Sequence, residues 1–310
     1  MTMTAQALFP KEQDAIVAAG DGLVAPAGPL SAAAARLSAW RRLTRRPAAV
    51  FGLAVISLFV ALALAAPWLA PYDPLATSWG AIRKAPSAAH WFGTDEIGRD
   101  VASRVMWGAR ASLLAGVVSV LISLSIGVPV GLLAGYAGGK VDMLISRLTD
   151  ALLACPFLIL AIALAAFLGP SLTNAMIAIG ISATPAFIRL SRGQALAVKA
   201  EEFVLAARAI GNSPLRIALR HVLPNILPAL IVQATLAIAA AVIAEASLSF
   251  LGLGQQPPAP SWGSMLNTAK NYVDNAPWMA IWPGVSIFAL VLSFNLVGDG
   301  LRDALDPRQT

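Results

Sequence analysis

The feature that most limits what this chain can fold into is a series of long windows without a charged residue. Such windows lie at 47–72, 111–139, 151–188, 222–244 and 275–298. A helix of about 20 apolar residues crosses a hydrocarbon core of roughly 30 Å. Each window is therefore long enough for at least one crossing, and we expect an all-α protein that passes through a membrane several times.

The composition agrees with this expectation. Hydrophobic residues make up 58% of the 310 residues and charged residues only 12%, with a mean hydropathy of +0.73. Soluble domains carry about 25% charged residues. The chain also has a single cysteine and two histidines, too few for a disulfide or for a metal site built from these residues.

One window is too long for a single crossing. As one helix, residues 151–188 would extend over about 57 Å, nearly twice the hydrocarbon thickness. The window contains the sequence Gly169-Pro170-Ser171, which is typical of a chain break. We therefore expect two spans in this window, and six transmembrane helices in total.

The distribution of lysine and arginine predicts the orientation. If the N-terminus lies inside, the inner segments hold 16 of the 22 basic residues, including the cluster Arg41–Arg46 just before the first span. Positive residues favour the cytoplasmic side, so both termini are expected there. This bias also explains the net charge of +6 without nucleic acid as a partner, and leaves membrane lipid as the expected contact.

The expected organisation has five parts. They are a cytoplasmic tail over 1–46 (disordered over 1–37), a first transmembrane helix over 47–71, an extracytoplasmic loop over 72–110, a five-helix core over 111–301 that includes a cytoplasmic loop over 198–225, and a cytoplasmic C-terminus over 302–310.

Four glycines are spaced four residues apart near the end of the second window. They are Gly127, Gly131, Gly135 and Gly139. Such a row forms a groove along one helix face that lets a neighbouring helix approach closely. The groove indicates either ordinary bundle packing or a helix interface that lines a pathway.

The chain shows no pattern for catalysis. Gly138-Gly139-Lys140 resembles the end of a phosphate-binding loop, but Ala134 replaces the first glycine and Val141 stands where serine or threonine is needed. There is also no HExxH motif and no convincing Ser–His–Asp set or carboxylate pair. We expect no enzyme activity and no cofactor or metal bound by this chain alone.

The expected outer loop contains a dense charged segment. Thr94 is expected to cap a helix whose first turn holds Asp95 and Glu96, and Asp100 is expected to pair with Arg104 four residues later. This segment is either a solvated interfacial helix or an extracytoplasmic gate or docking surface. The candidate residues for the second alternative are Asp95, Arg99, Asp100 and Arg104.

A single carboxylate, Glu245, follows directly on the window 222–244. Ionisable groups inside a membrane are costly and usually functional, which makes Glu245 a candidate for substrate contact or gating. Its position near the outer end also allows a simple interfacial role in contact with water.

The stretch EEFVLAARAIGNSPLRIALRHVLPNILP, residues 201–228, interrupts the apolar windows. Helix signals divide it into two. Gly211-Asn212 is a typical helix stop, and Ser213-Pro214 a typical start. The second helix is expected to run to about Leu223 and to end at Pro224. The stretch is either an amphipathic linker on the anionic leaflet or a docking surface for another protein.

The spacing of small residues in this stretch resembles the cytoplasmic loop of ABC importer permeases. That family's pattern is EAA-x3-G-x9-I-x-L-P, and Ala206-Ala207, Gly211 and Leu223-Pro224 stand in register with it. Leu205 and His221 depart from it. The departures resemble the peptide and nickel importers, whose version reads AAR…G…RH-x-LPN. Further resemblance to their C-type permease lies in the stretches Ala66–Pro74, Gly93–Arg104 and Leu248–Gly252.

The resemblance implies the type I ABC importer permease fold with six helices, in the bacterial cytoplasmic membrane. It implies a loop that couples to an ATPase, formed here by Ala206, Ala207, Arg208, Gly211, Ser213, Arg216, Arg220, His221, Leu223 and Pro224. The implied partners are a B-type permease, two ATPase subunits that bind ATP and Mg²⁺, and an extracytoplasmic binding protein.

The substrate is left open among dipeptides, oligopeptides, nickel complexes and glutathione-like compounds. The alternative function is a self-sufficient channel or secondary transporter. It would call for inverted repeats or several buried ionisable residues, neither of which the sequence shows.

Overall fold

The computed structural model describes residues 40–305, so the tail predicted over 1–37 lies outside it. Residues 42–305 belong to one unit, and this unit carries all the helices considered below. Its main elements are α3 (Pro47–Leu69), α4 (Val101–Ala137), α5 (Gly139–Leu153), α6 (Phe157–Leu168), α7 (Leu172–Lys199), α8 (Glu202–Ala209), α9 (Pro214–Ile217), η2 (Ala218–Val222), α10 (Leu223–Phe250), α11 (Trp262–Ala269) and α12 (Trp278–Leu305). The 3-10 turn η1 (Trp79–Ala81) lies in the loop before α4.

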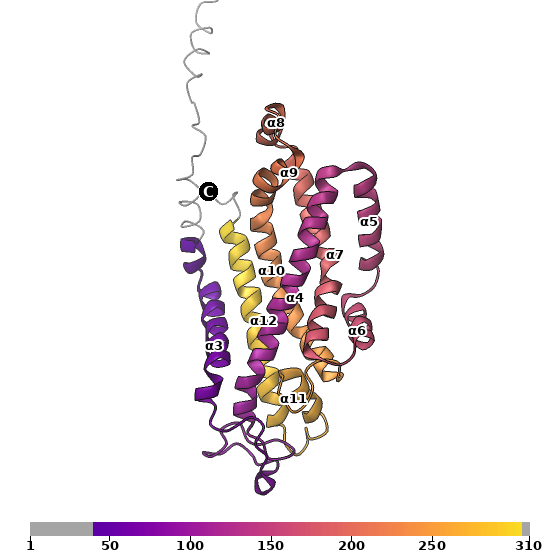
Figure 1. The fold of residues 1–310 in the computed structure, drawn as a ribbon. Helices are drawn as coiled ribbons and strands as arrows, with labels where there is room; N and C mark the ends of the chain where they lie inside the picture. The colour runs from indigo at the N-terminus through magenta and orange to yellow at the C-terminus, as the bar shows by residue number, and fades with distance from the viewer. Residues whose placement is uncertain (1–39, 306–310) are drawn as a thin grey trace, which may run out of the picture. The chain divides into compact units, whose positions relative to one another are not determined.

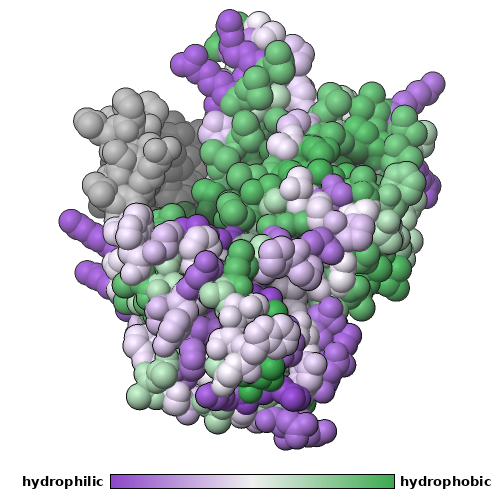
Figure 2. All heavy atoms as spheres, turned by 60° about the horizontal axis from the view of Figure 1, so that its bottom comes forward, coloured by the Kyte–Doolittle hydropathy of each residue, from purple (hydrophilic) through white to green (hydrophobic). Residues whose placement is uncertain are grey.

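The long helices lie side by side, and the short elements gather at the two ends of this bundle. In Figure 1, α8 and α9 stand at one end, whereas α11 and the loop before α4 stand at the other. Figure 2 shows that polar and weakly polar residues cover the end with α11, while the surface behind it is hydrophobic. A hydrophobic belt between two more polar ends is what a membrane-spanning bundle requires.

Within residues 40–305, four helices are long and apolar enough to cross a membrane: α3, α4, the continuous stretch α9–α10 and α12. The pair α5 and α6 qualifies only when taken together, because the two helices are bent by 88° at the break between them. Helix α7 has 28 residues but is not among these candidates, and it carries Arg189, Arg192 and Lys199. By length and composition the structure thus supports four or five spans, and the six predicted are reached only if α7 also crosses.

Helices α4 and α7 run parallel and form the tightest contact in the bundle. Phe187 and Thr184 lie against Gly127, and Ser191 and Ile188 lie against Gly131, so that a Cβ on Gly131 would stand 1.9 Å from Ser191 Oγ. Because these glycines have no side chain, the backbones of α4 and α7 come into direct contact, as in other membrane bundles.

The glycine row does not extend as far as predicted. Gly135 still contacts α7, at Arg192 and Ala195, but Gly139 has nothing within 4 Å of a Cβ built on it. Gly138 ends α4 with a φ of +68°, and the chain turns there, so that Gly139 begins α5. The turn removes Gly139 from the packed face.

Helix α11 anchors a second part of the core that the sequence did not reveal. Ser261 starts α11 with a reciprocal capping box with Ser264, and Trp262 is fully buried. The Trp262 indole Nε1 donates to the Val105 carbonyl at 3.0 Å, and Phe59 of α3 meets the ring edge-on. The indole thus links α3, α4 and α11 at one end of the bundle.

The loop before α4 is fastened to α12. Trp278 Nε1 donates to the Thr94 carbonyl at 3.0 Å, and the rings of Phe92 and Trp282 stack with centroids 3.9 Å apart. Helix α4 begins at Val101, ten residues before the charge-free window at 111. The loop predicted over 72–110 is therefore irregular only up to Asp100.

The helix that was predicted to end at Pro224 continues beyond it. The chain continues from α9 through η2, a π-helical turn, into α10, and the Leu223 N–H bonds to the Ala218 carbonyl. A wider turn relieves the conflict between a prolyl ring and the preceding backbone, which would otherwise break an α-helix. Asn225 Nδ2 also donates to the His221 carbonyl at 2.7 Å. The result is one long rod from Pro214 to Phe250.

Candidate functional site

The corner between α8 and α9 is built by the residues that predicted it. Gly211 has a φ of +81°, and its N–H bonds to the Arg208 carbonyl at 3.0 Å. Both the backbone and the side chain of Asn212 donate to the Ala207 carbonyl. The Ser213 hydroxyl then accepts from the Arg216 N–H, with Pro214 at the first helical position. Two short helices thus meet at a fixed angle rather than a flexible link.

One face of this helix pair holds it against the bundle. Val204 and Ala207 of α8 are buried in the same core as Ile217, Ala218 and Val222. Val222, the last residue of the π turn, points into the core, whereas Leu215 and Leu219 stay exposed. The helix pair is therefore anchored to the bundle by one face, and its opposite face is exposed.

The open face is apolar. Ile210 is 80% exposed and Leu215 69%, and three more large side chains on these elements are also exposed: Phe203, Leu205 and Leu219. Scattered exposed apolar residues are ordinary, but a group of five on one short protrusion indicates a contact surface. We call these five residues the apolar tip.

The elements of the apolar tip also carry basic side chains. Arg208, Arg216 and Arg220 are all exposed, as is Ala206 of α8. Leu205 stands where the family pattern has glutamate, and it contributes apolar surface instead of a charge. His221 is half-buried beside the π turn, and its carbonyl accepts from Asn225. These two departures therefore add to the tip and to the turn below it.

An apolar groove lies beside the tip. It has a volume of about 580 Å³ and runs between the last turns of α4 and the start of the long rod. Its walls are Val128, Pro129, Leu132, Leu133, Tyr136, Ala137, Pro214, Leu215, Ala218, Leu219 and Leu223. Leu215 and Leu219 thus belong both to the tip and to the groove.

At the opposite end, the charged segment before α4 differs from the prediction. Thr94 does not cap a helix: its hydroxyl donates to the Ala81 carbonyl and accepts from the Lys84 N–H. The N-cap of α4 is Asp100, whose Oδ2 accepts from the Ser103 N–H at 2.8 Å. Residues 94–99 instead form a tight turn that Asp95 and Gly98 make possible.

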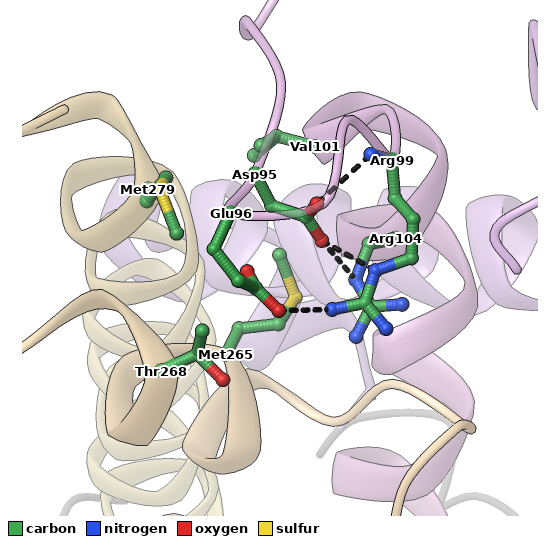
Figure 3. A pocket seen from close by; sticks show the side chains of 8 residues that line it. All are labelled: Asp95, Glu96, Arg99, Val101, Arg104, Met265, Thr268 and Met279. Carbon is green, nitrogen blue, oxygen red and sulfur yellow. Dashed lines mark hydrogen bonds and ion pairs between the residues drawn. The ribbon is translucent and has the colours of Figure 1, made fainter. Parts of the chain in front are cut away.

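Asp100 does not pair with Arg104 as predicted, because it is occupied by the cap and by His90 at 2.9 Å. Arg104 turns instead toward Asp95 Oδ2, at 3.5 Å from its Nε, and donates to the Pro74 carbonyl. Arg99 also bonds Asp95, at 2.6 Å, and its Nη2 reaches Glu96 at 2.7 Å. Figure 3 shows the two arginines converging on the two carboxylates.

Glu96 has one oxygen in this network and one outside it. Within the described residues, its Oε2 is buried without a hydrogen-bond partner. It borders a cavity of about 10 Å³, just enough for one water, whose other walls include Met265 and Thr268 of α11 and Met279 of α12. Burial, and next the charge of Asp95, raise the pKa of Glu96 above its ordinary value. The network is a buried joint between the loop, α11 and α12.

Glu245 lies in a second polar joint. It is completely buried, and its two oxygens accept hydrogen bonds from Ser112 of α4 at 3.1 Å and from Ser249 at 2.7 Å. Ser249 Oγ in turn accepts from the Gln255 N–H at 3.0 Å. In this conformation Glu245 links α4 to α10 and to the following loop, and its role in substrate contact or gating stays a prediction.

Two ion pairs between α5 and α7 had no counterpart in the predictions. Asp142 pairs with Arg192, with Nη2–Oδ2 at 2.8 Å, and Asp150 pairs with Arg189, with Nη2–Oδ1 at 2.7 Å. Both arginines follow the charge-free window 151–188, but α7 continues past them to Lys199. The available signal was the spacing of the two aspartates, eight residues apart on one short helix.

Known families match most of the chain. The family described as binding-protein-dependent transport system inner membrane component matches residues 127–310, and the N-terminal TM domain of oligopeptide transport permease C matches residues 37–86. The second match covers α3, and the first covers the bundle from the glycine row onward, including the α8–α9 corner.

Curated relatives are similar over nearly their whole length. The chain is 47% identical over 87% of its length, and 89% of the relative's, to the dipeptide transport system permease protein DppC of Alkalihalophilus pseudofirmus. It is 45% identical to the glutathione transport system permease protein GsiD of Pectobacterium atrosepticum, over 87% of this chain and 90% of that one. It is 47% identical to the probable D,D-dipeptide transport system permease protein DdpC of Escherichia coli, over 84% and 88%.

A solved structure shares the fold. An inward-facing conformation of the MetNI methionine ABC transporter matches with a TM-score of 0.56 and 23% identity, covering 66% of this chain and 97% of the other. The likeness shows an ABC importer permease architecture and no more. With a family match over residues 127–310 and relatives that share almost half of their residues, the chain belongs to the family of binding-protein-dependent transport system inner membrane components.

Proposed function

We propose that this permease subunit pairs with a second, B-type permease and forms with it a translocation pathway for short peptides or glutathione-like solutes. Two separate ATPase subunits bind ATP and Mg²⁺ and drive transport, and an extracytoplasmic binding protein delivers the solute. The substrate class follows the names of the dipeptide and glutathione permeases that the chain resembles.

The observation that carries the proposal is the apolar tip. Its two helices are rigidly joined at Gly211, anchored in the core through Val204 and Ala207, and exposed on their outer face. A rigid apolar protrusion with an arginine rim fits a groove on another protein better than it fits water. The tip continues directly into the rod α9–α10, so that a force on it reaches the membrane helices.

The orientation supports the same assignment. The tip lies at the end of the bundle where α3 begins and α12 ends. In the sequence, the basic cluster Arg41–Arg46 directly precedes α3. Positive residues favour the cytoplasm, where ATPase subunits act. The binding protein then meets the opposite end, with α11 and the polar loop before α4. Both termini are cytoplasmic in this arrangement, in the bacterial cytoplasmic membrane.

The docking role is tested by changing the tip without touching its anchors. Ile210→Ser and Leu215→Ser remove exposed apolar side chains, each worth about 1.5–3 kcal/mol when buried in a contact. Co-purification of the ATPase subunits with the permease pair should fall by about tenfold or more. Membrane insertion, followed by the amount of chain in the membrane fraction, should not change.

Phe167→Ser is the matched control, because Phe167 is 87% exposed on α6, away from the tip. It should leave ATPase association intact. Undiminished co-purification with both tip variants would refute the docking role. Uptake of solute by the purified chain alone, without ATP or partners, would instead favour a self-sufficient channel or transporter.

A further inference from the structure

Helix α3 contains a proline close to its last turn. Pro67 lies inside the helix, and the chain stays helical beyond it, since the Ala70 N–H bonds to the Ala66 carbonyl. A proline has no N–H, so the carbonyl four residues before it loses its donor within the helix. In α3 this carbonyl belongs to Ala63, which is buried. A buried carbonyl without a partner is costly, so that of Ala63 requires a donor from outside α3.

Arg110 of α4 supplies this donor. Its Nε donates to the Ala63 carbonyl, and its Nη2 donates to the Leu64 carbonyl at 3.3 Å. The guanidinium also lies over the ring of Trp107, one turn earlier on α4, with Cζ 4.5 Å from the ring centroid. The ring attracts the cation and limits its movement. The N–H groups of Arg110 are therefore held in place toward α3.

The two helices pack closely at this point. Ala63 of α3 belongs to the same buried core as Val105 and Ala109 of α4. Small side chains let two helices approach each other. The close approach brings the backbone of α3 within reach of a side chain that starts on α4.

A simpler account is that Arg110 extends toward the membrane surface, as interfacial arginines do, and touches the two carbonyls incidentally. The half-buried position of Arg110 and its contact with Trp107 favour a fixed role instead. The two accounts differ in one measurable respect. Only a fixed role makes the cost of losing Arg110 depend on the proline at position 67.

We propose that Arg110 is a positioning residue that replaces the N–H missing at Pro67 and thereby ties the last turns of α3 to α4. In transmembrane helices, prolines are tolerated where a neighbouring helix satisfies the freed backbone groups. The first turn of α3 is held separately, by the ion pair of Arg46 with Asp303 of α12. An arginine thus fastens each end of α3 to the bundle, and neither contact involves the apolar tip.

A double-mutant cycle in the full-length chain tests the link between the two residues. Arg110→Met should lower the Tm in detergent by about 3–8 °C, because the Ala63 carbonyl is left without a donor. In a Pro67→Ala chain the same change should cost less than about 2 °C, because the alanine N–H at position 67 then bonds that carbonyl. Equal losses in the two backgrounds would overturn the proposal.

Pro129→Ala is the matched control for removing a proline. Pro129 also lies inside α4, but far along the helix from Arg110, and it is exposed. Arg110→Met should cost as much in the Pro129→Ala chain as in the native one. A rescue by Pro129→Ala equal to that by Pro67→Ala would contradict a specific link. If Arg110→Met alone does not accumulate, the chain that also carries Pro67→Ala should, and its failure to do so would equally contradict the link.

A distance measurement tests whether Arg110 ties the two helices together. Spin labels are placed at Leu69→Cys on α3 and Leu114→Cys on α4, both exposed, in a Cys155→Ser chain that has no other cysteine. Arg110→Met should widen the distribution of distances between the labels by about 1.5-fold or more, because the end of α3 is no longer held. An unchanged width would overturn the tie.

Two further variants complete the distance measurement. Adding Pro67→Ala to Arg110→Met should restore Tm but leave the distribution wide, because the carbonyl is then satisfied within α3 and nothing joins it to α4. Arg302→Met, which removes an exposed arginine of α12, should keep the native width. An equal widening by Arg302→Met would refute a specific role for Arg110. These results do not depend on ATPase association, so they are independent of the proposed function.

Discussion

At the residue scale, the closest contact in the bundle depends on the side chains that are missing. On α4, Gly127, Gly131 and Gly135 let the helix pack closely against α7. Gly193, which is on α7 itself, faces open space. Substitution by alanine should therefore affect stability in opposite directions. A packed glycine has no room for the added methyl group, whereas at an open glycine alanine only reduces the backbone freedom of the unfolded chain.

Gly131→Ala should destabilise the chain by about 1–3 kcal/mol, since its Cβ would stand 1.9 Å from Ser191 Oγ and 2.4 Å from the Ile188 carbonyl. Thermal unfolding in detergent measures the effect. Gly193→Ala is the matched control and should be neutral or stabilising by up to about 1 kcal/mol. Equal Tm values for the two variants would contradict the packing described for α4 and α7.

Glu96 should make stability depend on pH. Burial raises its pKa in the folded chain, so the folded state holds the proton more tightly than the unfolded state. Stability therefore declines as pH rises from the ordinary glutamate pKa through the raised one. Glu96→Gln cannot ionise, and its Tm relative to the native chain should increase between mildly acidic and neutral pH.

Glu202→Gln, on the exposed α8, is the control for this pH comparison. It should shift Tm by a similar amount at both pH values. If the Tm shift of Glu96→Gln were equally independent of pH, ionising the buried carboxyl group beside Met265 and Met279 would not destabilise the folded state.

At the element scale, the start of α4 joins the polar end to the bundle. Asp100 caps the helix through Ser103 and also holds His90. Just before it, Asp95 gathers Arg99 and Arg104. Asp100 therefore fixes the residue at which α4 begins, and through His90 it also holds the preceding loop against the helix.

Asp100→Ala should lower the free energy of unfolding by about 0.5–2 kcal/mol through loss of the cap. Asp100→Asn should recover most of this loss, because asparagine caps a helix nearly as well. Chemical denaturation followed by tryptophan fluorescence measures both. Equal losses for the two variants would place the effect in the contact with His90 instead.

The elements differ in how far the sequence predicts them, for physical reasons. The corner at Gly211 and Ser213-Pro214 was predictable because a positive φ and an N-cap are local requirements. Helix α11 was not, because Trp262 is buried by α3 and α4, far away in the chain. The π turn before Pro224 and the exchange of partners at Asp100 likewise depend on tertiary contacts.

At the scale of the whole molecule, the bundle has two chemically different ends. One carries the apolar tip, and the other the buried ionic network around Asp95 and Glu96. Arg46 at the start of α3 pairs with Asp303 near the end of α12, so the first and last helices meet at the end with the tip.

This pairing, together with the basic cluster at Arg41–Arg46, predicts both termini on the cytoplasmic side. Fusions of a fluorescent protein that folds only in the cytoplasm should be bright at either terminus. Alkaline phosphatase, which is active only outside, should be inactive at both and active when inserted into the loop after Tyr72. Phosphatase activity at one terminus would reverse this orientation or require an odd number of crossings.

The continuity of the chain from Pro214 to Phe250 has a mechanical consequence. A 37-residue rod extends over about 55 Å, and a tilt of about 10° about one end displaces the other by about 10 Å. The π turn at Ala218–Val222 interrupts the α-helical hydrogen-bond pattern of this rod close to the apolar tip. At the far end of the rod, the hydrogen bonds of Glu245 with Ser112 and Ser249 are the contacts that such a tilt would strain first.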